Sequence, residues 1–129
     1  MNIARTIHLG LAWLLVVGLA YQIFLAGMGV FAGAESFATH RDFGFLLEGV
    51  PFFMAIAAWI GKLGRTHVVV ALVIFVLFLV QSFLILARED MPAVAALHPV
   101  NGFVITLLAV WVARDAWARR SASHSEVGR

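Results

Sequence analysis

Cysteine is absent from the sequence, and charged residues make up only 12% of its 129 positions. Without cysteine the chain forms no disulfide, thiolate metal site, iron–sulfur cluster or cysteine nucleophile. Charge this sparse is too little for the surface of a water-soluble domain, and hydrophobic residues reach 63%. The composition therefore predicts a protein whose solvent is the lipid bilayer.

Basic residues outnumber acidic ones only slightly, by 9 to 7, although the isoelectric point is about 9.9. A basic chain can bind nucleic acid, but here Lys and Arg lie at the ends of apolar stretches. A membrane explains that placement better, so we expect a lipid bilayer as partner and no nucleic acid.

Four long apolar stretches are what the sequence does contain. They cover about residues 6–34, 40–62, 66–87 and 91–113, and Glu48 interrupts the second. A helix rises about 1.5 Å per residue, so about 20 residues cross a hydrocarbon core of roughly 30 Å. A segment inside lipid must satisfy its own backbone hydrogen bonds, so each stretch is predicted to be a membrane-spanning helix.

The connections between these stretches are short, which forces neighbouring helices to run antiparallel. We predict an all-α, integral membrane, up-down-up-down four-helix bundle over residues 1–120, built from two tandem helical hairpins. The expected helices cover about residues 4–32, 37–61, 66–87 and 92–118. Pro51 and Pro99 are expected to kink the second and fourth helices, and residues 121–129 to form a disordered cytoplasmic tail.

Lys and Arg are divided unequally between the two ends of the predicted bundle. Arg41 and Arg88 fall at the end where the first helix finishes, and the other basic residues at the end that holds both termini. Basic ends of membrane helices stay in the cytoplasm. We therefore predict a multi-pass protein of the bacterial cytoplasmic (inner) membrane with both termini in the cytoplasm.

The first two predicted helices and the last two share a pattern of polar residues and glycines. The pairs His8/His67 and Gln22/Gln81 are 59 residues apart, and His40/His98 and Gly44/Gly102 are 58 residues apart. This spacing predicts two similar hairpins related by a pseudo-twofold axis along the membrane normal. Such an axis brings each repeated residue opposite its partner, so the repeated histidines are expected to form two facing pairs.

His40 and His98 begin the second and fourth predicted helices at similar depth. Each is followed four residues later, on the same helix face, by a glycine, Gly44 or Gly102. The missing side chain is expected to leave a flat slot that suits a porphyrin. Two opposed histidines in a bundle core hold a six-coordinate haem b, so both are predicted iron ligands, with Arg41 pairing with a propionate. The alternative is that the two imidazoles only hydrogen-bond neighbouring helices.

His8 and His67 form the second pair, at the cytoplasmic ends of the first and third predicted helices. No glycine follows either of them at the fourth residue. Two interpretations stay open: iron ligands of a second haem, or histidines at the level of the lipid headgroups. Gln22 and Gln81 are likewise open between hydrogen bonds that join helices and contacts to a haem edge or a quinone carbonyl.

A short string at the start of the second predicted helix, His40-Arg41-x-x-Gly44, resembles the corresponding helix in one four-helix half of haem A synthase. Gln81 and His98 fit the later part of that half. The resemblance covers most of residues 15–115 and implies haem binding by His40 and His98.

Two further resemblances are less informative, one because it is to proteins of unknown function and the other because it is distant. The strings at residues 22–27 and 97–102 resemble a group of small four-helix bacterial membrane proteins of unknown function, and cytochrome b561-type proteins share the two histidine pairs more distantly. The synthase reaction is not implied, because that enzyme has two such halves and Phe37 stands where it has an acidic residue.

These features together predict a membrane b-type cytochrome with one haem b, or two if the second histidine pair also binds. Its role would be electron transfer, or redox or haem sensing, with a quinone or a membrane redox protein as partner, because two histidine ligands leave no open iron position. Two alternatives remain: a haem-free accessory or assembly subunit of a membrane complex, and a small proton-coupled transporter that uses Glu48. Whether the protein is an enzyme stays open.

Overall fold

The computed structural model describes residues 2–127, with side chains described for residues 2–121. All regular structure in this part of the chain is helical: α1 (Ile3–Phe31), η1 (Ala34–Ser36), α2 (Phe37–Glu48), α3 (Val50–Ile60), α4 (Arg65–Leu86), α5 (Pro92–Ala95) and α6 (Leu97–Val127). These helices make four spans that are long and apolar enough to cross a membrane: α1, η1 to α3, α4, and α5 with α6 as far as Ser121. The prediction of an all-α membrane bundle with four spans is confirmed.

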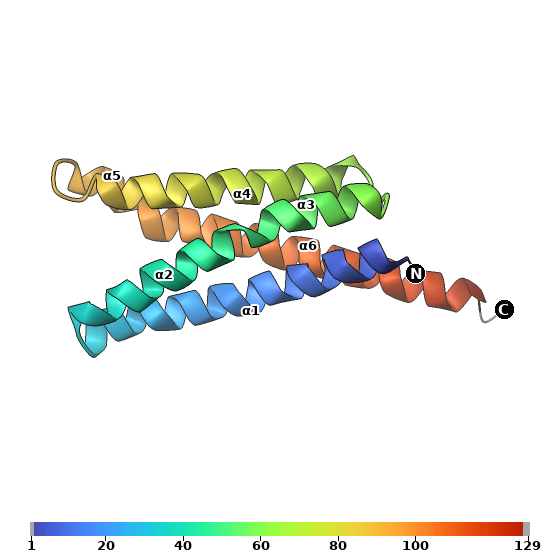
Figure 1. Ribbon diagram of the computed structural model, residues 1–129, viewed down its shortest axis with the longest axis horizontal. Helices are drawn as coiled ribbons and strands as arrows, with labels where there is room; N and C mark the ends of the chain where they lie inside the picture. Colours follow the sequence, from blue (N-terminus) through green and yellow to red (C-terminus); the bar gives the residue numbers. More distant parts are fainter. Residues whose placement is uncertain (1, 128–129) are drawn as a thin grey trace.

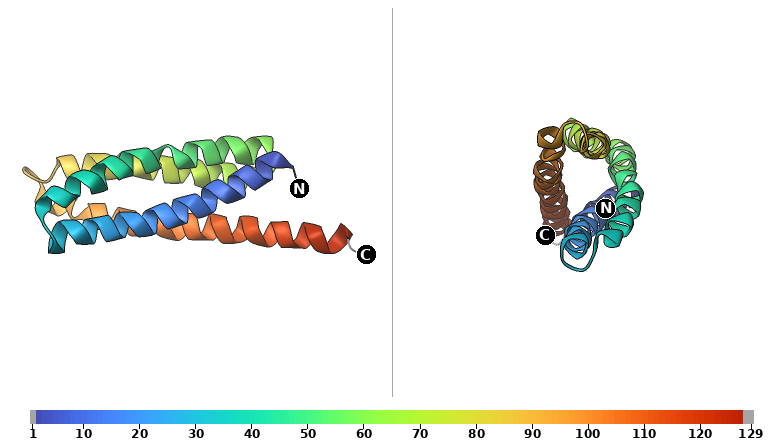
Figure 2. Two further views of the ribbon diagram at one scale, coloured as in Figure 1. Left: turned by 60° about the horizontal axis from the view of Figure 1, so that its bottom comes forward. Right: turned by 90° about the vertical axis from the view of Figure 1, so that its left-hand side faces the viewer.

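Successive spans run in opposite directions and form an up-down-up-down bundle (Figures 1 and 2). The N-terminus, the turn at residues 61–64 and the C-terminal part of α6 share one end, which we call the termini end. The turns at residues 32–36 and 87–91 lie at the distal end. α1 and α4 each pack on α3 and α6 but stand on one diagonal, and α2 and α6 stand on the other.

Prolines interrupt the second and fourth spans. α2 and α3 meet at Gly49, because Pro51 has no backbone N–H and its ring disturbs the preceding turn. The fourth span opens with the single turn α5 at Pro92 and restarts at Leu97. Pro99 therefore lies in the first turn of α6, where a missing N–H is tolerated, and the interruption precedes it.

The last helix is longer than predicted. α6 continues to Val127, so the prediction of disorder over residues 121–129 is wrong for residues 121–127, and residues 128–129 lie outside the described part. Alanine and arginine, which favour helices, follow the apolar stretch. Asp115 and Arg119 form an ion pair one turn apart, which supports the same helix.

Small and branched apolar side chains fill the interior of the bundle. Leu15, Met54 and Ile74 are fully buried. Fully buried alanines stand among them, and their small size lets membrane helices approach closely; they include Ala12, Ala58, Ala71 and Ala109. Large apolar side chains such as Phe31 and Trp59 are exposed on the outside, so the surface of the bundle matches lipid.

Candidate functional site

The structure brings His40 and His98 together at the distal end. His40 lies in the first turn of α2 and His98 is the second residue of α6, so each comes from a different hairpin. Their ring centroids are 6.2 Å apart and the ring planes make an angle of 58°. Both side chains are partly buried. The two helices stand on one diagonal of the bundle, as the internal repeat predicts.

Both imidazoles are held by the same contact in each hairpin. The Nδ1 of His40 lies 3.0 Å from the backbone oxygen of Gln22, and the Nδ1 of His98 lies 3.1 Å from that of Gln81. A carbonyl oxygen only accepts, so each Nδ1 carries the hydrogen and each Nε2 carries the lone pair of a neutral ring. Within the described part of the chain, neither Nε2 has a hydrogen-bond partner.

The space beside the glycines is filled, contrary to the predicted flat slot. A Cβ added at Gly44 would lie 2.7 Å from the side-chain nitrogen of Gln22, and one at Gly102 would lie 3.3 Å from that of Gln81. Each glycine therefore makes room for a glutamine amide. The sequence suggested the glycines and the glutamines separately, but only the packing of the hairpins shows that they are partners.

The two glutamines differ in their hydrogen bonds. Gln81 donates to the His98 carbonyl at 2.9 Å and accepts from the Asn101 amide at 2.6 Å. The side-chain oxygen of Gln22 is buried without a partner. The reason is the residue in the place of Asn101: by the offset of the repeat it is Phe43, whose ring packs on Tyr21 and offers no donor.

Arg41 follows the first histidine of this pair but is turned toward solvent. Its guanidinium pairs with the neighbouring Asp42 at 2.8 Å, and both side chains are exposed. The proposed pairing of Arg41 with a propionate stays a prediction.

His8 and His67 meet across the other diagonal, near the termini end. The two side chains are 0% exposed, and the Nε2 of His8 lies 3.1 Å from the Nδ1 of His67. Iron bound between two imidazoles needs their nitrogens about 4 Å apart with the porphyrin between them, since a metal–imidazole bond is about 2.0 Å. This arrangement therefore differs both from a second haem site and from exposed headgroup-level histidines, and we do not propose haem here.

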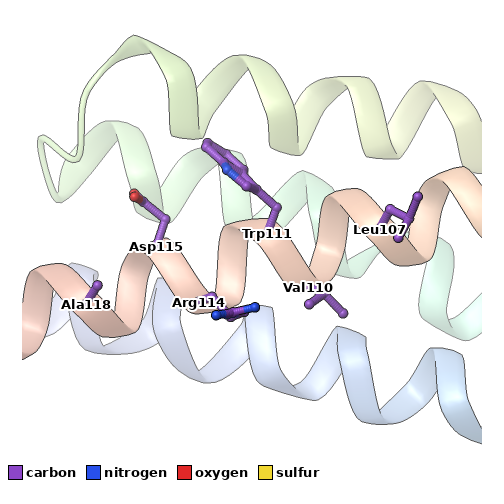
Figure 3. Close-up of a pocket in the computed structure, with 6 residues that line it drawn as sticks. All are labelled: Leu107, Val110, Trp111, Arg114, Asp115 and Ala118. Atoms are coloured by element: carbon purple, nitrogen blue, oxygen red, sulfur yellow. The ribbon is translucent and has the colours of Figure 1, made fainter.

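Further contacts extend this inner pair at both ends. The Nδ1 of His8 lies 2.9 Å from the Met54 carbonyl, and the Nε2 of His67 lies 2.7 Å from Asp115. Trp111 also approaches His67, with ring centroids 6.1 Å apart. Figure 3 shows Trp111 and Asp115 on the side of α6 that faces the yellow-green helix α4.

Sequence reasoning missed Asp115 and Trp111. Asp115 stands among arginines after the last apolar stretch, where a charge ordinarily indicates only the end of a membrane helix. A usable signal was the spacing of four residues from Trp111 to Asp115 and from Asp115 to Arg119, which places all three on one face of a helix.

The second span carries one half-buried carboxyl, Glu48, at the C-terminal end of α2. Glu48 accepts a hydrogen bond of 3.3 Å from Ser82 of α4. Among the described residues, no three His, Cys, Asp or Glu side chains gather into a metal site. Glu48 is thus a hydrogen-bonded contact between the two hairpins.

The comparisons with known proteins place the chain in a family. No curated protein and no solved structure matches it, so the resemblances to haem A synthase and cytochrome b561 stay predictions. A family description does match over residues 22–88, just over half of the chain. That segment includes the contact between Gln22 and His40 as well as His67. The chain belongs to a family of unknown function, DUF6220.

Proposed function

We propose that the protein is a membrane b-type cytochrome that binds one haem b between His40 and His98 and transfers electrons. The observation that carries the proposal is the geometry of this pair. Two imidazoles from different hairpins lie at one height, each with Nδ1 bound to a carbonyl and Nε2 available. A histidine that ligates a metal characteristically donates its other N–H to such an acceptor.

The spacing of the rings suits a single metal ion. A metal–imidazole bond is about 2.0 Å and a ring nitrogen lies about 1.1 Å from the ring centroid, so two opposed ligands place their centroids about 6 Å apart. The observed 6.2 Å agrees with that separation. The inner pair, at 5.1 Å between centroids, is closer than this and forms a direct hydrogen bond.

The carbonyls of Gln22 and Gln81 fix the tautomer and the direction of each ring, and they raise the basicity of the ligating nitrogen. The two glutamine amides pack against the glycines, but a glutamine side chain has several rotatable bonds and can leave this place. Haem with two histidine ligands supplies one-electron transfer and offers no open position for a substrate. The residues therefore favour an electron carrier over an enzyme of oxygen chemistry.

The electron donor that fits the site is a quinol. The side-chain oxygen of Gln22 is a buried acceptor without a donor, and such atoms are rare in folded proteins. A quinol would supply the missing donor through a hydroxyl group, and the molecule as a whole is apolar enough to arrive through lipid. This class of donor would deliver one electron at a time near the distal end.

Orientation in the membrane follows from the basic residues at the termini end. Arg5 binds the carbonyls of Gly61 and Lys62 there, and the other basic side chains that the structure describes at that end are Lys62, Arg65, Arg114, Arg119 and Arg120. By the positive-inside rule this end stays in the cytoplasm of a bacterial inner membrane. The proposed haem site would then lie near the outer face.

The test is an absorption spectrum of the protein purified in detergent from cells supplied with a haem precursor. We expect a Soret band, sharp α and β bands after dithionite reduction, and one haem per chain by pyridine haemochrome. His40→Ala and His98→Ala should each lose the six-coordinate spectrum. His124→Ala is the matched control, because it removes an imidazole beyond the four spans. A colourless wild-type protein would reject the cytochrome and favour a haem-free accessory subunit.

A further inference from the structure

Three side chains near the termini end form hydrogen bonds in series. The Met54 carbonyl, His8, His67 and Asp115 are joined by contacts of 2.9, 3.1 and 2.7 Å, in that order. Four different helices supply these groups: α3, α1, α4 and α6. Both imidazoles are fully buried, so each ring nitrogen depends on these neighbours.

The three contacts can all be hydrogen bonds only if the series carries one proton more than two neutral imidazoles and an ionised carboxylate would. The Met54 carbonyl only accepts, so the Nδ1 of His8 carries a hydrogen. The Nε2 of a neutral His8 then accepts, and the Nδ1 of His67 must donate to it. The remaining nitrogen of His67 would face the carboxylate with a lone pair unless a hydrogen lies between them.

We propose that His67 and Asp115 bind one exchangeable proton, supported by His8, and exchange it with the solution at the termini end. The proton sits between the Nε2 of His67 and the carboxyl oxygen, either as an imidazolium with a carboxylate or as a neutral ring with a carboxylic acid. The inference concerns the inner pair and holds whether or not haem binds at the distal end.

Access to this proton is through Asp115. Its side chain is 31% exposed, while His67 is closed off. An open groove of about 410 Å³ along α6 includes Asp115 and Trp111 in its lining (Figure 3). Of the groups in the series, Asp115 is therefore the one that is open to the outside of the bundle.

Positive charges around Asp115 favour the form in which its carboxyl is ionised and the shared proton lies on the imidazole of His67. Asp115 also binds Arg119. Among the residues whose side chains the structure describes, the other charged residues of these helices and of the turn after α3 are basic: Arg5 on α1, Lys62 after α3, Arg65 on α4, and Arg114 and Arg120 on α6. Asp115 offsets this positive charge, and the added proton is accommodated because it is shared with the carboxylate.

The proton can move one step inward and no further. When the N–H bond at the Nδ1 of His67 breaks and one forms at the Nε2 of His8, the positive charge passes from His67 to His8. His67 is then neutral and still donates to Asp115. Beyond His8 the series ends at a carbonyl that cannot take up a proton. The arrangement is thus a proton store open to one side, and not a channel.

Asp115→Asn is the diagnostic variant because an amide satisfies the same geometry without the proton. The Asn nitrogen donates to the Nε2 of His67, whose Nδ1 donates to His8, whose Nδ1 donates to Met54. The contacts of the series are kept with both rings neutral, and only the ion pair with Arg119, which uses the same carboxyl oxygen, is lost. Asp42→Asn is the matched control, since Asp42 is an exposed carboxyl paired with an arginine at the distal end.

The experiment is nitrogen-15 NMR of the histidine-labelled full chain in lipid nanodiscs at neutral pH, with infrared spectroscopy of the carboxyl groups. We expect wild type and Asp42→Asn to show either an imidazolium at the inner pair or a protonated Asp115. Asp115→Asn should lose this signal, a difference of one proton per chain. Neutral rings beside an ionised Asp115 in the wild type, or an imidazolium retained in Asp115→Asn, overturn the proposal. If Asp115→Asn does not fold, the wild type decides, because its signal must titrate away as one proton.

Discussion

Replacing Asn101 with leucine removes two hydrogen bonds to α4, one of which supports the side chain of Gln81, the residue whose carbonyl holds His98. The amide of Asn101 donates to the Leu77 carbonyl at 2.9 Å and to the Gln81 side-chain oxygen at 2.6 Å. Hydrogen bonds between membrane helices average about 0.6 kcal/mol each, and a buried acceptor left without a donor costs about 1–3 kcal/mol. The unfolding free energy is therefore expected to fall by about 2 kcal/mol, roughly 30-fold in the equilibrium constant.

The internal repeat supplies the control for this variant. Phe43 occupies the equivalent place in the first hairpin, where the Gln22 oxygen already lacks a partner. Phe43→Leu removes an apolar contact with Tyr21 but no hydrogen bond, so its loss should stay below about 1 kcal/mol. Both variants are compared by reversible unfolding in bicelles titrated with denaturing detergent, followed by circular dichroism.

The reasoning predicts a clear order between the two variants. Equal losses for Asn101→Leu and Phe43→Leu, or no loss for Asn101→Leu, would refute the assigned support of Gln81.

Three further outcomes follow from the packing. His67→Phe leaves His8 buried without its partner, so unfolding free energy should fall by about 2–3 kcal/mol in the bicelle assay while the haem spectrum is retained. Ala12→Leu inserts three carbons at a fully buried position and should cost about 1–3 kcal/mol in the same assay, whereas Ala38→Leu, at an exposed position, should not. Pro51→Ala should join α2 to α3, raise helix content by circular dichroism and lower haem retention by moving His40; unchanged helix content and retention would contradict this role.

The apolar stretches and the repeat were enough to predict the architecture. Length alone separates four membrane spans, because lipid leaves the backbone no other choice. The matched spacings predict that His40 faces His98 and that His8 faces His67, and the structure has both pairs on the expected diagonals. The repeat within a single sequence thus indicates which residues of the two hairpins occupy equivalent positions.

Distances within each pair depend on packing that the residue pattern did not reveal. At the inner pair the residues four positions after the histidines are Ala12 and Ala71, both fully buried. Small residues on both helices of that diagonal let the rings come into contact. At His40 and His98 the residues four positions on are glycines, and the space beside them holds the glutamine amides.

Contacts that cross between distant parts of the chain were the hardest to predict. Asp115 reaches His67 from a helix that starts at the distal end, and no spacing in the sequence joins the two residues. The tail was expected to be disordered because it is polar, but alanines, arginines and the pair of Asp115 with Arg119 continue the helix.

Ligation of one iron by His40 and His98 is tested most directly by a redox titration of His98→Met beside the wild type. Methionine in place of one histidine ligand raises the reduction potential of a haem iron. We predict a higher midpoint potential for His98→Met, with one haem per chain retained. An unchanged potential and spectrum would show that His98 is not a ligand and would contradict the account.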